Sequence, residues 1–433
     1  MENKDIKLMD GVYIHCMKTD RFKTNYIYIT LLTRLNRETV TKNALIPLVL
    51  RRGTSSYPTM QDISIKLDEM YGSSMDANVD KMGDYMAIQL MMEMISDEYA
   101  LEKSEILKDG IDLISEILLK PVLENGAFKK EYVEQEKETL KELINSKIND
   151  KGNYAFNTAI EKLYKDEPYG LYKYGYVEDL DKINARNLYE QYLDVLRDSE
   201  IHIYVSGNFN EIEVADEFNS YFENVDRNFN NWIALGKASK ALGSVMEVFK
   251  RTDDSNTDIV VEHQNVIQGK LVLGYTLRAF NEKADFYPMT VYSAILGGTA
   301  SSKLFNNVRE KKSLAYTIRS QYIKHKGAMF VNAGIENENC LLAKECIFKE
   351  IEDMRTGEFT EEEIHDAKVN LVTRFRSFND SQAAMIGWSV GQKLLGGDED
   401  LDVVIDNINK VSKAQILDVA NRLELSMTYF LTK

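Results

Sequence analysis

The sequence predicts an α+β protein of two similar lobes, each an antiparallel-rich sheet with helices packed on it, facing each other across a cleft. Three observations support this fold class. Only five prolines occur among 433 residues, which favours long elements because proline interrupts both helices and strands. Strand-like runs alternate with long stretches of helical periodicity. The same order of elements occurs once in each half of the chain, which indicates a duplicated domain.

The first half opens with two runs rich in β-branched and aromatic residues, GVYIHCM (11–17) and NYIYITLLT (25–33), which are typical of strands. In the long helix predicted further on, at 97–119, Leu101 is expected to share an apolar stripe with Ile106 and Ile117. The complete set predicted after the first two strands is helices at 42–51 and 59–71, strands at 74–79 and 83–92, helices at 97–119 and 127–149, a strand at 201–206 and a helix at 210–223.

Residues 224–257 interrupt this pattern with Asn, Lys, Ser and Gly between short apolar pieces, as a linker does. We therefore expect a first lobe at 1–228, a linker at 229–257 and a second lobe at 258–433. The second lobe repeats the plan with a strand at 271–280, helices at 283–296 and 301–312, strands at 314–322 and 326–334, helices at 338–355, 361–376, 381–395, 400–409 and 413–423, and a closing strand at 427–432. Thr360 and Glu363 form a capping-box pattern.

Composition narrows the classes of function. The formal net charge is −16, so the chain would repel phosphate and nucleic acid is not expected as a partner. The cysteines Cys16, Cys340 and Cys346 are odd in number and lack CxxC spacing, which favours reduced thiols over disulfides or a thiolate zinc site. The polar N-terminus lacks the apolar core of a signal peptide, and no apolar run is long enough to span a bilayer. We expect a cytoplasmic protein without a membrane partner.

The five histidines do not form a metal-binding pattern, because no two lie within one helical turn. His15 and His202 fall inside predicted strands and are expected to complete the sheet. His365 lies in a charged helical segment and is expected to be solvated. An independent zinc site is therefore not expected.

Two segments resemble a known family. ALIPLVLRRGTSSYPTMQDISIKLDEMYG (44–72) resembles the region of M16 peptidases in which His-x-x-Glu-His precedes Leu-Phe-Lys-Gly-Thr. ILGGTASSKLFNNVREKKSLAYTI (295–318) resembles the Leu-Gly-Gly, Ser-Ser-x-Leu-Phe and Arg-Glu-x-x-x-Leu-Ala-Tyr signature of the same family. The chain is thus identified as similar to the insulinase/pitrilysin, mitochondrial-processing-peptidase-like M16 metallopeptidases. It looks like the subunit type of Gram-positive bacteria that lacks the zinc motif, and the resemblance implies two M16-type lobes.

The departure from the family pattern lies in the zinc motif. Aligning Gly53-Thr54 with the family's Gly-Thr puts Ala44, Pro47 and Leu48 where the resemblance implies histidine, glutamate and histidine. Side chains of these three types cannot coordinate zinc. The family's later zinc-binding glutamate corresponds to Glu142, or to Glu138 in the other possible register. The resemblance therefore implies no cofactor in this chain and zinc in a partner subunit.

The second segment keeps two residues that the family uses to hold peptide substrate, because Arg309 and Tyr316 match its arginine and tyrosine. An arginine fork can donate to a peptide carbonyl or carboxylate, and a tyrosine hydroxyl can stabilise an oxyanion. From spacing alone another explanation stays open. Arg309 near a helix end would favour the negative pole of that helix, and Tyr316 would be an ordinary strand aromatic.

The resemblance implies a non-catalytic, peptide-binding subunit that supplies Arg309 and Tyr316 to the zinc site of a partner. Its partners would be a peptide or unfolded polypeptide and a zinc-bearing M16 subunit in a heterodimer, or a second copy in a homodimer. One alternative is a structural or binding protein that keeps the fold without a proteolytic role. Another is a metallopeptidase active alone through displaced ligands.

Overall fold

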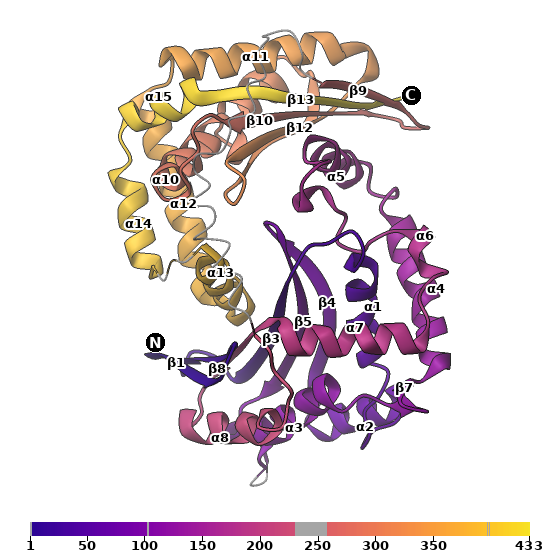
Figure 1. Cartoon of the computed structure of the whole chain (residues 1–433). Helices are drawn as coiled ribbons and strands as arrows, with labels where there is room; N and C mark the ends of the chain where they lie inside the picture. The colour runs from indigo at the N-terminus through magenta and orange to yellow at the C-terminus, as the bar shows by residue number, and fades with distance from the viewer. Residues whose placement is uncertain (1, 102–103, 230–257, 396, 398) are drawn as a thin grey trace. The chain divides into compact units, whose positions relative to one another are not determined.

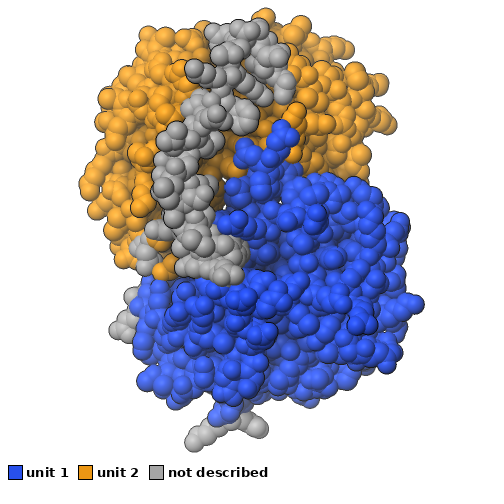
Figure 2. Space-filling view, viewed as in Figure 1, with its two compact units in different colours: residues 1–146, 166–246 blue, residues 147–165, 247–433 orange. Residues whose placement is uncertain are grey.

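The computed structural model describes residues 2–101, 104–229, 258–395, 397 and 399–433. The chain divides into two compact units, coloured in Figure 2. Unit 1 comprises Met1–Ser146 and Asp166–Met246, and unit 2 comprises Lys147–Lys165 and Glu247–Lys433. The predicted linker at 229–257 lies, except for its first residue, outside the described residues, so the lobe boundaries drawn from it stay a prediction.

Unit 1 is built on a six-stranded sheet in the order β1-β2-β8-β3-β5-β4 (Figure 1). Neighbouring strands are antiparallel except for β2 and β8, which are parallel. The strands are β1 (Glu2–Met9), β2 (Val12–Lys18), β3 (Thr24–Arg34), β4 (Ser74–Met82), β5 (Tyr85–Ile95) and β8 (Glu200–Gly207). In β3, alternate residues such as Ile27, Ile29 and Leu31 point into the core, as period-2 patterning requires.

The apolar face of this sheet packs against helices whose buried residues join the same core. The long helix predicted at 97–119 is wrong in its first turns, because the helix α3 begins at Ile106 and Leu101 is 91% exposed rather than part of the apolar stripe. The helices and short elements of unit 1 are α1 (Val40–Leu50), α2 (Met60–Glu69), η1 (Asp97–Tyr99), α3 (Ile106–Leu119), β6 (Leu123–Glu124), β7 (Ala127–Phe128), α4 (Lys130–Ser146), η2 (Pro168–Gly170), α6 (Val177–Leu180), α7 (Ala185–Asp198) and α8 (Glu211–Phe222).

Unit 2 contains a five-stranded sheet in the order β11-β12-β10-β13-β9. The strands are β9 (Asp258–His263), β10 (Gly269–Leu277), β11 (Ala315–Ile323), β12 (Ala328–Ile335) and β13 (Leu423–Thr432). The pair β9 and β13 is parallel and the other pairs are antiparallel. This order and these directions reproduce β4-β5-β3-β8-β2 of unit 1, so the predicted duplication is confirmed in the sheet topology.

Helices cover the core face of the second sheet, as α11 does in Figure 1. The predicted capping box is present, because Thr360 and Glu363 exchange side chain-to-backbone hydrogen bonds at the start of α12. The elements are α10 (Glu282–Ser293), η3 (Ala294–Gly298), η4 (Phe305–Lys311), η5 (Asn337–Asn339), α11 (Cys340–Thr356), α12 (Glu361–Ser377), η6 (Phe378–Asp380), α13 (Gln382–Leu395), α14 (Leu401–Lys410) and α15 (Lys413–Arg422).

One helix of unit 2 comes from the first half of the chain. Helix α5 (Lys151–Leu163) packs on β10, β12 and β13, on the face opposite α11. The rings of Phe156 and Phe330 meet edge to face with centroids 5.3 Å apart. The hydroxyls of Tyr154 and Tyr429 each donate a 2.7 Å hydrogen bond to the Glu262 carboxylate. Both faces of the second sheet are therefore occupied.

The three cysteines are free thiols, with Cys16 and Cys346 buried and Cys340 half-buried, which agrees with the predicted reduced state. Among the residues described, we find no helix with both the length and the apolar character needed to cross a bilayer.

Candidate functional site

Helix α1 carries the positions that correspond to the family's zinc motif. Its sequence, VTKNALIPLVL, is almost entirely apolar, and the helix is buried against α4, α7, β4 and β5. Ala44 is 2% exposed and Leu48 is 6% exposed, and Pro47 is also buried. The three side chains therefore fill the core and offer no nitrogen, oxygen or sulfur ligand to a metal.

The acidic residues predicted beside this helix lie on the exposed side of α4. Glu142 and Glu138 are both exposed, and Glu138 pairs with Lys141 at 3.2 Å. The buried acid of α4 is Glu136, which is 3% exposed. Its carboxylate pairs with Arg52 at 3.2 Å and with Arg51 at 3.7 Å, at the C-terminal end of α1. The Arg52 guanidinium also lies over the Tyr132 ring, 4.9 Å from its centroid.

Glu136 was not among the residues predicted from the sequence, although its spacing marks it. Val133, Glu136 and Leu140 recur at helical spacing, and all three are buried. Burying an ionised carboxylate on an apolar stripe is energetically unfavourable unless a cation pairs with it. The position of Glu136 therefore indicates a basic partner. In this chain that partner is the Arg51-Arg52 pair, and the end of α1 is held by an ion pair.

The histidines are placed as the sequence predicted. His15 in β2 and His202 in β8 are buried, and His15 Nε2 lies 2.8 Å from His202 Nδ1. His15 Nδ1 lies 2.7 Å from an oxygen of Asp5 in β1. His365 is exposed on α12. Across the described residues, no three or more His, Cys, Asp or Glu side chains converge to form a metal-binding group.

Arg309 lies on η4, a π-helical segment that ends just before β11. Its guanidinium stacks over the Phe305 ring, 4.6 Å from the centroid, and its Nε lies 3.6 Å from Glu310. The Arg309 side chain is 42% exposed, so water screens its ion pair with Glu310 and the pair contributes little to stability. Stacking orients the guanidinium and leaves its donors accessible.

Tyr316 lies at the start of β11, where the register with β12 shifts, and it is 51% exposed. Its hydroxyl donates a 2.7 Å hydrogen bond to a carboxylate oxygen of Glu336. This hydrogen bond raises the pKa of Tyr316, so the hydroxyl stays protonated at neutral pH and remains a donor. Glu336 was not predicted from the sequence, because only the pairing of β11 with β12 brings it beside Tyr316.

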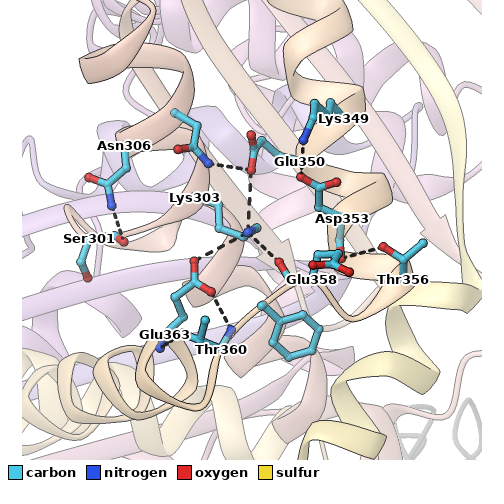
Figure 3. Close-up of polar contacts among 12 residues, drawn as sticks. Ser301, Lys303, Asn306, Lys349, Glu350, Asp353, Thr356, Glu358, Thr360 and Glu363 are labelled. Atoms are coloured by element: carbon cyan, nitrogen blue, oxygen red, sulfur yellow. Dashed lines mark hydrogen bonds and ion pairs between the residues drawn. The ribbon is translucent and has the colours of Figure 1, made fainter.

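A buried ion pair anchors η4 to the rest of unit 2 (Figure 3). Lys303 and Glu350 have side chains 9% and 8% exposed, and their charged atoms are 3.9 Å apart. The Lys303 ammonium also donates a 2.9 Å hydrogen bond to the Glu358 carbonyl. Asn307, within η4, donates a 2.8 Å hydrogen bond to Glu350. The segment that presents Arg309 is thus fixed by buried polar contacts.

Arg309 and Tyr316 lie on consecutive elements that pack against each other. The turn between them contains Ser313 in the left-handed conformation, with φ of 52°. Gly297 in η3 lies so close to β11 that an added Cβ would come within 2.6 Å of the Ser320 nitrogen, so only glycine fits there. The structure therefore brings the two predicted substrate-binding residues to one end of the second sheet, beside its edge strand β11.

Comparisons with known proteins identify the family that the chain resembles. Residues 182–371 match the family model described as the peptidase M16 inactive domain. The chain is 31% identical to a probable inactive metalloprotease, YmfF, of Bacillus subtilis over 97% of this chain and 96% of that protein. An uncharacterized zinc protease of the same organism, YmxG, is 24% identical over 60% of this chain and 64% of that protein.

Solved structures of M16-like proteins share the fold of this chain. A conserved protein from Enterococcus faecalis V583 superposes with a TM-score of 0.87 at 28% identity, covering 99% of this chain and 98% of that chain. A peptidase M16 inactive domain from Pseudomonas fluorescens superposes with a TM-score of 0.75 at 13% identity, covering 100% of this chain and 98% of that chain, which shows the shared fold.

The chain belongs to the M16 peptidase family. Within that family it is a homologue of the inactive metalloprotease type.

Proposed function

We propose that the chain is a non-catalytic, peptide-binding subunit that supplies Arg309 and Tyr316 to the zinc site of a partner M16 peptidase. The main support is a difference in exposure between two sets of residues. The helix that corresponds to the zinc motif presents Ala44, Pro47 and Leu48 to a closed core, whereas the side chains of Arg309 and Tyr316 are exposed to solvent. Zinc is expected in the partner and not in this chain.

The surroundings of the two residues suit an extended peptide. β11 is an edge strand, so its outer backbone N–H and C=O groups can pair with an added strand. Tyr316, Thr317 and Arg319 are exposed along it. A peptide carboxylate or carbonyl would accept a hydrogen bond from the Arg309 guanidinium. The Tyr316 hydroxyl would donate its hydrogen bond to an oxyanion instead of to the Glu336 carboxylate.

The proposed assembly is a heterodimer with a zinc-bearing M16 subunit, and a homodimer is the second possibility. The 24% identity to YmxG of Bacillus subtilis, which is named as an uncharacterized zinc protease, supports the choice of a zinc-bearing relative as the partner. Three free thiols suit a reducing compartment, and we place the pair in the cytoplasm.

A structural or binding role without proteolysis is the alternative, and one observation favours it. Arg309 already stacks on Phe305, and Tyr316 already bonds Glu336, so both side chains have local partners without a peptide. Under this alternative the chain associates with a partner but no peptide is cleaved in any combination.

The proposal is tested by measuring peptide hydrolysis when the chain is mixed with a zinc-bearing M16 subunit. We expect Tyr316→Phe and Arg309→Ala each to lower kcat/KM by about 10²-fold, the usual loss when one transition-state donor is removed. Assembly with the partner, measured by gel filtration, should be unchanged.

Matched controls are Tyr99→Phe and Arg374→Ala, which alter an exposed tyrosine of unit 1 and an exposed arginine of α12. Neither control should change hydrolysis. Undiminished hydrolysis in both Arg309→Ala and Tyr316→Phe would contradict the proposed role.

A further inference from the structure

One row of side chains crosses the second sheet on the face that α5 covers. Tyr429 in β13 pairs in register with Val272 in β10. Val272 pairs with Asn332 in β12, and Asn332 pairs with Arg319 in β11. Tyr429 lies on the α5 side, since its hydroxyl and that of Tyr154 on α5 bond one carboxylate. Residues directly opposite each other on paired strands share a face, so Asn332 and Arg319 lie on the α5 side too.

Helix α5 covers only part of this row. Val272 is 1% exposed, whereas Asn332 is half-buried and Arg319 is exposed. On the same face Thr317 is exposed, and its partner on β12 is Gly334, whose added Cβ would come within 2.7 Å of the Thr317 hydroxyl oxygen. The row is therefore polar and open at the β11 edge of the sheet.

The two polar side chains at this end have no hydrogen-bond partner among the described residues. The Nδ2 and Oδ1 atoms of the Asn332 amide are both buried and unpaired. Within the same part of the chain, Arg319 makes no hydrogen bond or ion pair. Burying an amide without a partner lowers stability, so the position of Asn332 favours a role outside the packing of the sheet. A guanidinium and an amide side by side offer several donors to one ligand group.

We propose that Arg319 and Asn332 bind an acidic side chain, glutamate or aspartate, of a peptide added as a strand along β11, an inference that rests on the proposed peptide-binding function and adds its substrate class. Side chains of an added strand lie opposite those of β11 on the same face, so one of them lies beside Arg319. A carboxylate accepts two parallel hydrogen bonds from the guanidinium and another from the Asn332 amide.

The place of the acidic residue in the peptide follows from strand spacing. Arg319 comes three residues after Tyr316, which corresponds to about 10 Å along a strand. The peptide carbonyl that meets the Tyr316 hydroxyl is therefore about three residues from the acidic side chain. In the mixture with a zinc-bearing M16 subunit, we expect cleavage at about this separation from a glutamate or aspartate, measured by mass spectrometry of the products.

The test is the binding of labelled peptides to the full chain, measured by fluorescence anisotropy with the chain alone and after a zinc-bearing M16 subunit is added. The probe is a fluorescein-labelled nonapeptide of alternating threonine and alanine with a central glutamate, and two comparison peptides carry glutamine or lysine at that position. We expect the glutamate peptide to bind about tenfold more tightly than the glutamine peptide, because charged acceptors form stronger hydrogen bonds. Arg319→Ala should abolish this difference, and Arg319→Glu should reverse it in favour of the lysine peptide.

A second variant tests the role of the unpaired amide. Asn332→Leu should weaken binding of the glutamate peptide and raise the melting temperature of the chain, because it removes a buried polar group that has no partner. Arg374→Ala, at an exposed position of α12, is the matched control and should change neither property. Equal affinity for the glutamate and glutamine peptides, or a preference for glutamate that persists in Arg319→Ala, would overturn the inference.

The same samples separate this inference from the proposed function. If Arg309→Ala and Tyr316→Phe lower hydrolysis but the glutamate and glutamine peptides bind equally, only the preference for an acidic residue is wrong. If glutamate binding depends on Arg319 but no peptide is hydrolysed in the mixture, the preference is confirmed and the role at a partner's zinc site is wrong. No binding of any of the peptides in either sample would contradict both.

Discussion

Replacing Arg51 and Arg52 together by alanine is expected to lower the free energy of unfolding by about 3–5 kcal/mol, the usual cost of leaving a buried charge unpaired. Glu136 is 3% exposed, and its two cationic partners are these arginines at the end of α1. Without them the Glu136 carboxylate stays buried and unpaired beside α1, the helix that carries the zinc-motif positions. Urea unfolding followed by circular dichroism measures the effect.

Two further variants separate this explanation from a general loss of surface charge. Arg186→Ala removes an exposed pair with Glu190 and should cost no more than about 0.5 kcal/mol. Adding Glu136→Leu to the double arginine variant should recover most of the lost stability, because no buried charge then remains. If the double variant unfolds like the wild type, the Glu136 ion pair does not hold α1.

Lys324→Met is expected to remove a pH dependence of stability. Lys324 lies between aromatic rings of unit 2, with its ammonium 6.0 Å from the Phe286 centroid and 5.5 Å from that of Trp388. Burial lowers the pKa of Lys324 from 10.5 to about 8, against the opposing effect of Glu282. Between these two pH values the unfolded chain binds a proton that the folded chain has released.

The sign of the effect follows from this difference. Stability of the wild type should increase as pH rises from about 8 to 10.5, by up to about 1.4 kcal/mol for each pH unit. Subtracting the Lys324→Met curve from the wild-type curve isolates this contribution. Lys283→Met, at an exposed position of α10, should leave the slope intact. Equal slopes for wild type and Lys324→Met would show that Lys324 keeps an ordinary pKa.

Local patterns predicted much of the fold. The β-branched and aromatic runs of β2 and β3 and the apolar stripes of α3 and α4 depend on neighbours in the sequence, so periodicity identified them. The sequence does not predict β9, because its short apolar run follows directly on the polar segment at 224–257 that has the composition of a linker. The first turns predicted for α3 were wrong because Leu101 lies outside the helix, which starts at Ile106.

The residues of the candidate site could be proposed from the sequence only where a motif marked them. Arg309 and Tyr316 were identified through the family resemblance, and the structure places both on exposed surface beside β11. Glu336 and Glu350 were not, because their roles depend on strand pairing and helix packing between residues distant in the chain. Likewise, no local pattern indicates that α5 leaves the first half of the chain to cover the second sheet.

We expect this chain to hold no zinc through α1 and to depend on a partner for hydrolysis. The most direct measurement is the zinc content of the chain purified alone after incubation with excess zinc and removal of free metal, together with its peptide hydrolysis before and after a zinc-bearing M16 subunit is added. We predict negligible bound zinc and no hydrolysis alone, with hydrolysis appearing in the mixture. Stoichiometric, tightly held zinc with chelator-sensitive hydrolysis by the chain alone would contradict the account.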